Sequence, residues 1–178
     1  LWDDPVWYIE TRYLASERAF VATLHDPKRC GAEHQAFMAP FFRVRSHCCS
    51  RAAFLGDERD LAHPSALRTG RLDGGVRRGE ETVAVVEHPF SLAPGEEKSF
   101  ALILGASPSP ARRRRWIRAY RRAAQRNAAF REVERFWERA VARQRIETPS
   151  ASFDRWINVW VKHQEYQCHR WAGGGSAN

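Results

Sequence analysis

The sequence lacks the long apolar runs that mark membrane and secreted proteins. No stretch of its 178 residues approaches 18 consecutive apolar positions, so we expect no membrane span. The first ten residues also lack the basic start and apolar run of a secretory signal peptide. We therefore expect a cytoplasmic protein with no membrane partner.

Cysteine is scarce and is not arranged in metal-binding pairs. The four cysteines are Cys30, Cys48, Cys49 and Cys168, and none forms a CxxC motif. His47 stands beside two of them, but adjacent side chains on a strand point to opposite faces, which is poor geometry for a metal. We expect no metal site, and we expect free, buried thiols in a reducing compartment.

Motifs of catalysis are also missing. The sequence contains no GxSxG, HExxH, GxxxxGK or GxGxxG, and the glycines at 173–175 are not followed by the lysine of a phosphate loop. An acidic cluster, Asp57, Glu58 and Asp60, is better explained as solvated loop charge, because general acid work needs burial or a like-charged neighbour. We assign no catalytic residue.

What remains is enough for a folded core. The chain is 43% hydrophobic and 12% aromatic, which fits one or two modest units rather than a disordered segment. It opens on Leu1, has its single methionine at position 38, and closes on the small residues 173–178. We interpret it as a piece of a longer protein.

The first hundred residues show strand signals. Short β-branched and aromatic runs, each ended by turn residues, lie at 6–11, 19–25, 35–39, 41–46, 82–87, 89–92 and 98–104. Several short antiparallel strands separated by turns predict a β-sandwich. The glycine-rich stretch 57–79 between them is predicted to be loop-rich and to run over the surface.

After Ser107 the period becomes helical. Ser109 and Pro110 form a helix start, and amphipathic patterns predict helices over 111–127, 128–145 and 152–171. The predicted fold class is therefore a β-sandwich followed by α-helices.

Positive charge is concentrated in the first two predicted helices. Residues 111–145 hold 13 arginines against 3 glutamates, a surplus of ten, so the rest of this +8 chain carries −2. The run Arg112–Arg115 with Trp116 and Tyr120 could bind nucleic acid through phosphate contacts and stacking. Alternatively, the arginine stems cover apolar surface while Trp116 and Tyr120, four residues apart, face the core. Because no RNA-binding or zinc-finger motif accompanies the run, we expect no nucleic-acid partner.

The third predicted helix mixes polar and aromatic groups instead of the usual glutamate and lysine. They are Trp156, Asn158, Trp160, His163, Gln164, Gln167, Arg170 and Trp171. Amide, imidazole and indole groups offer the hydrogen bonds and stacking faces that a sugar needs. The alternative is a packed helix whose amides bond to neighbouring backbone.

An ordered series of short motifs resembles a known family. The motifs are RAAFLG at 51–56, PSALRTG at 64–70, FSLAPGEE at 90–97, FALILG at 100–105 and FDRWINVWVKHQ at 153–164. Together they resemble the cellobiose and chitobiose phosphorylases of glycoside hydrolase family ninety-four. That family also contains the phosphorylase-like domain of cyclic β-1,2-glucan synthases.

The resemblance implies a domain organisation. Residues 1–107 would be the later part of an amino-terminal β-supersandwich domain, residues 108–147 a helical linker, and residues 148–178 the first helix of a truncated (α/α)6 catalytic barrel. The parent enzyme would be a homodimer.

The resemblance also implies an activity. The parent would be a glycosyltransferase, an inverting glycoside phosphorylase that converts a β-linked glucoside and inorganic phosphate into an α-sugar 1-phosphate, with no cofactor. Its partners would be oligosaccharide and phosphate, and its catalytic aspartate would lie beyond this chain, which would be inactive alone. The family's sugar-contacting loop follows the first barrel helix, which makes Gln167, Arg170 and Trp171 candidate sugar-binding residues.

Two hypotheses from other functional classes remain open when only the residues are considered. The chain could be a carbohydrate-binding or scaffolding sandwich module without chemistry, or its arginine-rich helices could form a nucleic-acid surface. Glucan binding that survives removal of residues 151–178 would favour the first.

Overall fold

The computed structural model describes residues 8–25, 34–57 and 60–173, with the backbone alone for residues 170–173. The chain divides into two compact units, Leu1–Arg122 and Ala123–Asn178, and each is described by itself. Among the described residues, no helix combines the length and the apolar character needed to cross a membrane.

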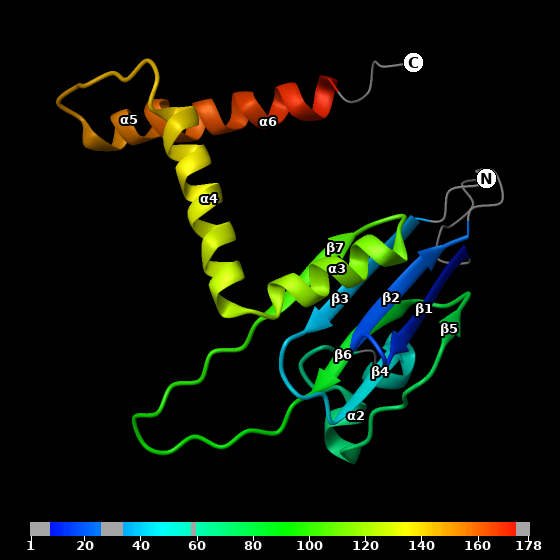
Figure 1. Cartoon of the computed structure of the whole chain (residues 1–178). Helices are drawn as coiled ribbons and strands as arrows, with labels where there is room; N and C mark the ends of the chain where they lie inside the picture. The colour runs from blue at the N-terminus through cyan, green and yellow to red at the C-terminus, as the bar shows by residue number, and fades with distance from the viewer. Residues whose placement is uncertain (1–7, 26–33, 58–59, 174–178) are drawn as a thin grey trace. The chain divides into compact units, whose positions relative to one another are not determined.

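The first unit is built on a five-stranded antiparallel sheet (Figure 1). Its order is β5-β1-β2-β3-β7, from β1 (Ile9–Leu14), β2 (Ala19–Leu24), β3 (His34–Pro40), β5 (Arg77–Arg78) and β7 (Leu102–Ala106). A second, two-stranded sheet pairs β4 (Ser46–Ser50) with β6 (Thr82–Glu87). Two short helices, α1 (Arg51–Leu55) and α2 (Ser65–Thr69), follow β4.

Alternation along the strands gives the large sheet two apolar faces. On one face Val21 pairs with Phe37, which pairs with Gly105 in β7. Helix α3 (Pro110–Tyr120) covers this face, because Ile117 joins Val21 and Phe37 in one buried cluster. The core of this unit therefore lies between a helix and a sheet.

The opposite face of the sheet meets the small sheet. Tyr13 of β1 and Phe20 of β2 contact the His47 ring of β4, with ring centroids 4.3 and 6.0 Å away. The neighbouring Cys48 and Cys49 are free thiols and are fully buried, as the sequence predicted. Burial raises the pKa of the Cys49 thiol to about 11, so this thiol stays protonated at neutral pH.

The predicted burial of the thiols is wrong at Cys168. This cysteine is a free thiol, as predicted, but it is exposed on helix α6 (Lys162–Gly173). Cys30 lies outside the described residues.

The order of antiparallel sheets followed by helices confirms the predicted fold class. The strands predicted at 19–25, 35–39 and 82–87 are present, and the helix start predicted at Ser109 and Pro110 is confirmed. Ser109 accepts a hydrogen bond from the backbone N–H of Arg112, which is the expected N-cap contact.

Two strand predictions are wrong, because the strand predicted at 41–46 begins only at Ser46 and the one predicted at 89–92 is irregular. The described part of 57–79 is mostly exposed loop, as predicted, and it also contains the short elements α2 and β5. In the irregular segments, Phe42, His88 and Phe100 contact one another in tilted or edge-on arrangements, with ring centroids 4.9 to 5.7 Å apart. Their sequence resembles a strand pattern, but Phe42 precedes β4, and His88 and Phe100 lie in the long loop between β6 and β7, whose backbone Figure 1 shows.

The boundary between the first two helices is also misplaced. Helix α3 ends at Tyr120 and α4 spans Ala123–Val141, whereas the sequence predicted helices over 111–127 and 128–145. Neither Arg121 nor Arg122 is a helix-breaking residue, so the break has no local sequence signal.

The second unit contains the third predicted helix, which is confirmed. It runs through α5 (Ala151–Arg155), a π-helical turn at Trp156–Val161, and α6. A π turn widens a helix by one residue and re-aims the side chains around it.

Gly105 generates a prediction for the core. A Cβ at this position would lie 2.8 Å from the Phe37 ring, closer than real contacts allow. Gly105→Ala should therefore lower the free energy of unfolding by about 1–3 kcal/mol, measured by urea denaturation. In a Phe37→Leu background the ring is absent and the added loss should fall by at least about half. An equal loss in both backgrounds would contradict this account.

Candidate functional site

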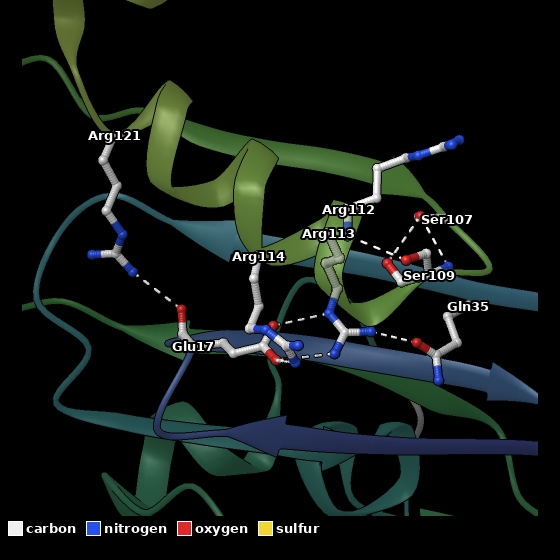
Figure 2. A network of polar contacts seen from close by, with 8 residues as sticks. All are labelled: Glu17, Gln35, Ser107, Ser109, Arg112, Arg113, Arg114 and Arg121. Carbon is white, nitrogen blue, oxygen red and sulfur yellow. Dashed lines mark hydrogen bonds and ion pairs between the residues drawn. The ribbon is translucent and has the colours of Figure 1, made fainter.

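A buried arginine joins helix α3 to the sheet (Figure 2). The Arg113 side chain is 4% exposed, and its Nε and Nη2 donate to the two carboxylate oxygens of Glu17, at 2.9 and 3.0 Å. Its Nη1 donates to the side-chain oxygen of Gln35 on β3. This fork-to-fork pairing is the geometry in which arginine and carboxylate bind each other best.

Glu17 lies in the turn between β1 and β2 and gathers two more arginines. Arg114 Nη1 lies 3.6 Å from its carboxylate, and Arg121 Nη2 donates to its backbone carbonyl at 3.1 Å. The hydrogen bond from Arg113, opposed by burial and aided by the nearby positive charges, lowers the pKa of Glu17 below its ordinary value of 4.5. Glu17 is therefore ionised in the folded protein at neutral pH.

The arginine run is thus split between the core and the surface. Arg113 is buried, whereas Arg112, Arg114 and Arg115 are exposed. Trp116 packs against the Phe37 ring, with centroids 6.4 Å apart, so it faces the core. The alternative in which Trp116 serves packing is confirmed, and this indole is not an open stacking face for a base.

The predicted sugar-binding residues lie on α6. Gln167 is half-buried there and makes contacts within the protein. The helix backbone continues through Arg170 and Trp171, but their side chains lie outside the described part of the structure. The sugar-binding role of all three stays a prediction.

A hollow of about 410 Å³ lies between α4 and α6 in the second unit. Its described lining includes Trp137 of α4 and Lys162, Glu165, Tyr166 and His169 of α6, and does not include Gln167. Sequence reasoning missed Lys162, Glu165, Tyr166 and His169. Their spacing on α6 is an ordinary helical one, so nothing in the sequence distinguished them from a solvated face.

The aromatic groups near this hollow form a cluster. The centroid of the Trp137 ring lies 4.5 Å from that of His163 and 5.3 Å from that of Tyr166. Phe136 contacts both Trp137 and Tyr166. The Nδ1 atom of His163 is buried and finds no partner among the described residues. Aromatic rings clustered in this way stack on the apolar faces of sugars, and they also pack helices against one another.

Two polar side chains of the long helix bind the segment that precedes it. Asn158, 5% exposed, accepts from the backbone N–H of Ile146 at 2.9 Å and donates to its carbonyl at 2.8 Å. Lys162 Nζ donates to the carbonyls of Val141 and Arg143 at the end of α4. For Asn158 the structural alternative, an amide bonded to neighbouring backbone, is confirmed.

The Arg113–Glu17 pair predicts a pH dependence of stability. Because its pKa is lowered on folding, Glu17 contributes stability above pH 4.5, and this contribution is lost as the pH falls through the lowered value. Glu17→Gln leaves Arg113 buried without its counter-charge and should reduce the free energy of unfolding at pH 7 by on the order of 3 kcal/mol.

Urea denaturation at pH 7 and at pH 3.5 measures this effect. The gap between wild type and Glu17→Gln should narrow at the acidic pH, whereas the exposed control Glu97→Gln should follow wild type at both. A gap that does not change with pH would refute the role given to Glu17.

Comparison with known proteins identifies the first unit. The family profile "Glycosyl hydrolase 94, supersandwich domain" matches residues 6–123. An N,N'-diacetylchitobiose phosphorylase from Vibrio furnissii is 30% identical over 137 residues, which cover 76% of this chain and 17% of that protein. A solabiose phosphorylase from Paenibacillus borealis is 27% identical over 90% of this chain and 21% of its own length.

A third relative belongs to the synthase branch named by the sequence resemblance. The cyclic β-(1,2)-glucan synthase NdvB of Rhizobium meliloti is 25% identical over 90% of this chain and 6% of its own length. The chain thus spans about a fifth or less of the relatives it matches. The family profile covers well over half of the 178 residues. The chain therefore belongs to the glycosyl hydrolase 94 family, and residues 6–123 form its supersandwich domain.

Proposed function

We propose that this chain is the supersandwich and leading helical part of an inverting glycoside phosphorylase. The observation that carries the proposal is the family match over residues 6–123, followed by a helix that contains the polar and aromatic side chains of residues 153–171. The named relatives include phosphorylases of N,N'-diacetylchitobiose and of solabiose. The substrate class is a β-linked disaccharide or short oligosaccharide, with inorganic phosphate as second substrate and no cofactor.

The reaction transfers a glycosyl group from an oxygen of the acceptor sugar to phosphate. A phosphate oxygen forms a bond to the anomeric carbon from the face opposite the leaving group, and the glycosidic C–O bond breaks. A carboxylic acid gives its proton to the leaving oxygen, so the products are an α-sugar 1-phosphate and a free sugar. We place that acid, an aspartate in the family, on a segment of the full-length protein outside this chain, and residues 148–178 at the start of an (α/α)6 barrel.

Within this chain we assign scaffolding to the first unit and sugar contact to the end of α6. Gln167, Arg170 and Trp171 would bind a hydroxyl, a ring oxygen and an apolar sugar face through amide, guanidinium and indole groups. The full-length enzyme would act as a cytoplasmic homodimer, and the 178-residue chain alone would be inactive.

An assay of sugar 1-phosphate release tests the activity. The full-length gene product, incubated with a panel of β-linked disaccharides, should release α-sugar 1-phosphate only when inorganic phosphate is present. The 178-residue chain should release none, because it contributes no acid to the reaction. Release from full-length protein without phosphate, or activity of the short chain, would contradict the proposal.

Gln167 tests the sugar site. In the full-length enzyme Gln167→Ala should raise the KM for disaccharide about tenfold while leaving the KM for phosphate within about twofold, since the lost hydrogen bond would go to sugar. The matched control is Gln125→Ala, an exposed glutamine on α4. Equal changes in both KM values would argue for a general structural role of Gln167.

A further inference from the structure

A second hollow, of about 330 Å³, lies in the first unit beside the β1–β2 turn. The turn and helix α3 both contribute to its wall, and the described lining consists of Ser16, Glu17, Arg18, Arg114, Ile117, Arg118 and Arg121. It is separate in sequence from the sugar residues proposed on α6. We call it the turn–helix hollow.

The charges around the turn–helix hollow do not balance. Four arginines line it, and Glu17 is the one acid among the described lining residues. Glu17 is already neutralised by the buried Arg113, through both carboxylate oxygens. The described lining residues of the hollow thus carry more positive than negative charge.

Two of these arginines are held in place before any ligand arrives. Arg114 lies against the Glu17 carboxylate at 3.6 Å, and Arg121 is bound to the Glu17 carbonyl at 3.1 Å (Figure 2). Arg114, Arg118 and Arg121 follow one another at helical spacing, so they share one face of α3 and its end. Arrangement by Glu17 reduces the entropy that these side chains would lose on binding.

Arg18 brings the fourth guanidinium from the other wall. Its backbone has a φ of 50°, the left-handed region that non-glycine residues seldom adopt, which places this side chain at the corner of the turn. Arg18 therefore lines the hollow from the turn, whereas the other three arginines line it from α3 and its end.

We propose that the turn–helix hollow binds a small phosphate-bearing anion. Guanidinium groups present planar pairs of N–H donors that match phosphate oxygens, and several of them together favour a multiply charged group over a single carboxylate. The hollow is open and has room for a phosphate or diphosphate group. A longer nucleic-acid strand is less suited, because Trp116 of the same helix is turned into the core and offers no stacking face.

Pyrophosphate binding to the 178-residue chain tests the proposal directly. Isothermal titration calorimetry with pyrophosphate, in buffers matched for ionic strength, should show saturable binding at one site. Arg118→Gln should weaken that binding about tenfold, because one charge-assisted contact is lost. Arg118 is exposed and lies outside the described Glu17 network, so the variant should fold as wild type does, which a thermal unfolding curve checks.

Arg115→Gln is the matched control. Arg115 is an exposed arginine of the same helix and is not among the described residues that line the hollow. The Arg115→Gln substitution removes the same charge but no group that lines the hollow, so it should change pyrophosphate affinity by less than about twofold. A second titration with glucose 1-phosphate shows whether a phosphate ester binds in the same way as the inorganic ion.

Three results would overturn the proposal. The first is that the folded chain shows no saturable pyrophosphate binding. The second is that Arg118→Gln and Arg115→Gln lose the same pyrophosphate affinity. The third is that the chain binds a single-stranded oligonucleotide but not pyrophosphate. Because these titrations contain no disaccharide and measure no turnover, they are independent of the glycoside phosphorylase assignment.

Discussion

The pair of Arg113 and Glu17 connects positions 96 residues apart and fixes helix α3 on the sheet. A guanidinium that is almost fully buried must have all of its donors satisfied, since an unpaired buried charge is strongly destabilising. Glu17 in the β1–β2 turn and Gln35 on β3 supply an acceptor to each of the three guanidinium nitrogens, which fixes where the helix can pair this charge. Ile117, one turn later, then reaches the apolar cluster on the same face of the sheet.

This pairing also decides what the other arginines do. Both carboxylate oxygens of Glu17 accept hydrogen bonds from Arg113, so little of its negative charge remains to balance Arg114. The backbone carbonyl of Glu17 accepts a hydrogen bond from Arg121. Glu17 therefore neutralises the charge of the buried Arg113 and also gathers positively charged arginines around the β1–β2 turn. The net charge of the segment does not reveal this division, because one arginine of the run is buried while its neighbours are exposed.

Much of the fold could be predicted because its signals are local. The alternation in β2 and β6, the Ser109 cap and the apolar stripe of residues 152–171 depend on neighbours within a few positions. Other features depend on distant partners. Nothing in the run Arg112–Arg115 distinguishes the buried member from the exposed ones, and Lys162 acts on carbonyls about 20 residues earlier. The family resemblance was readable from motif order, but the contacts of Gln167 with sugar would depend on segments outside this chain.

The two units use their polar side chains in different ways. In the first, Arg113 binds both Gln35 and Glu17 of the β1–β2 turn, and the sheet faces are covered by a helix and by a second sheet. In the second, Asn158 bonds fully to backbone while Trp156 and Trp160 beside it remain 52% and 57% exposed. The two exposed indoles leave an apolar face of this helix that the described residues do not cover.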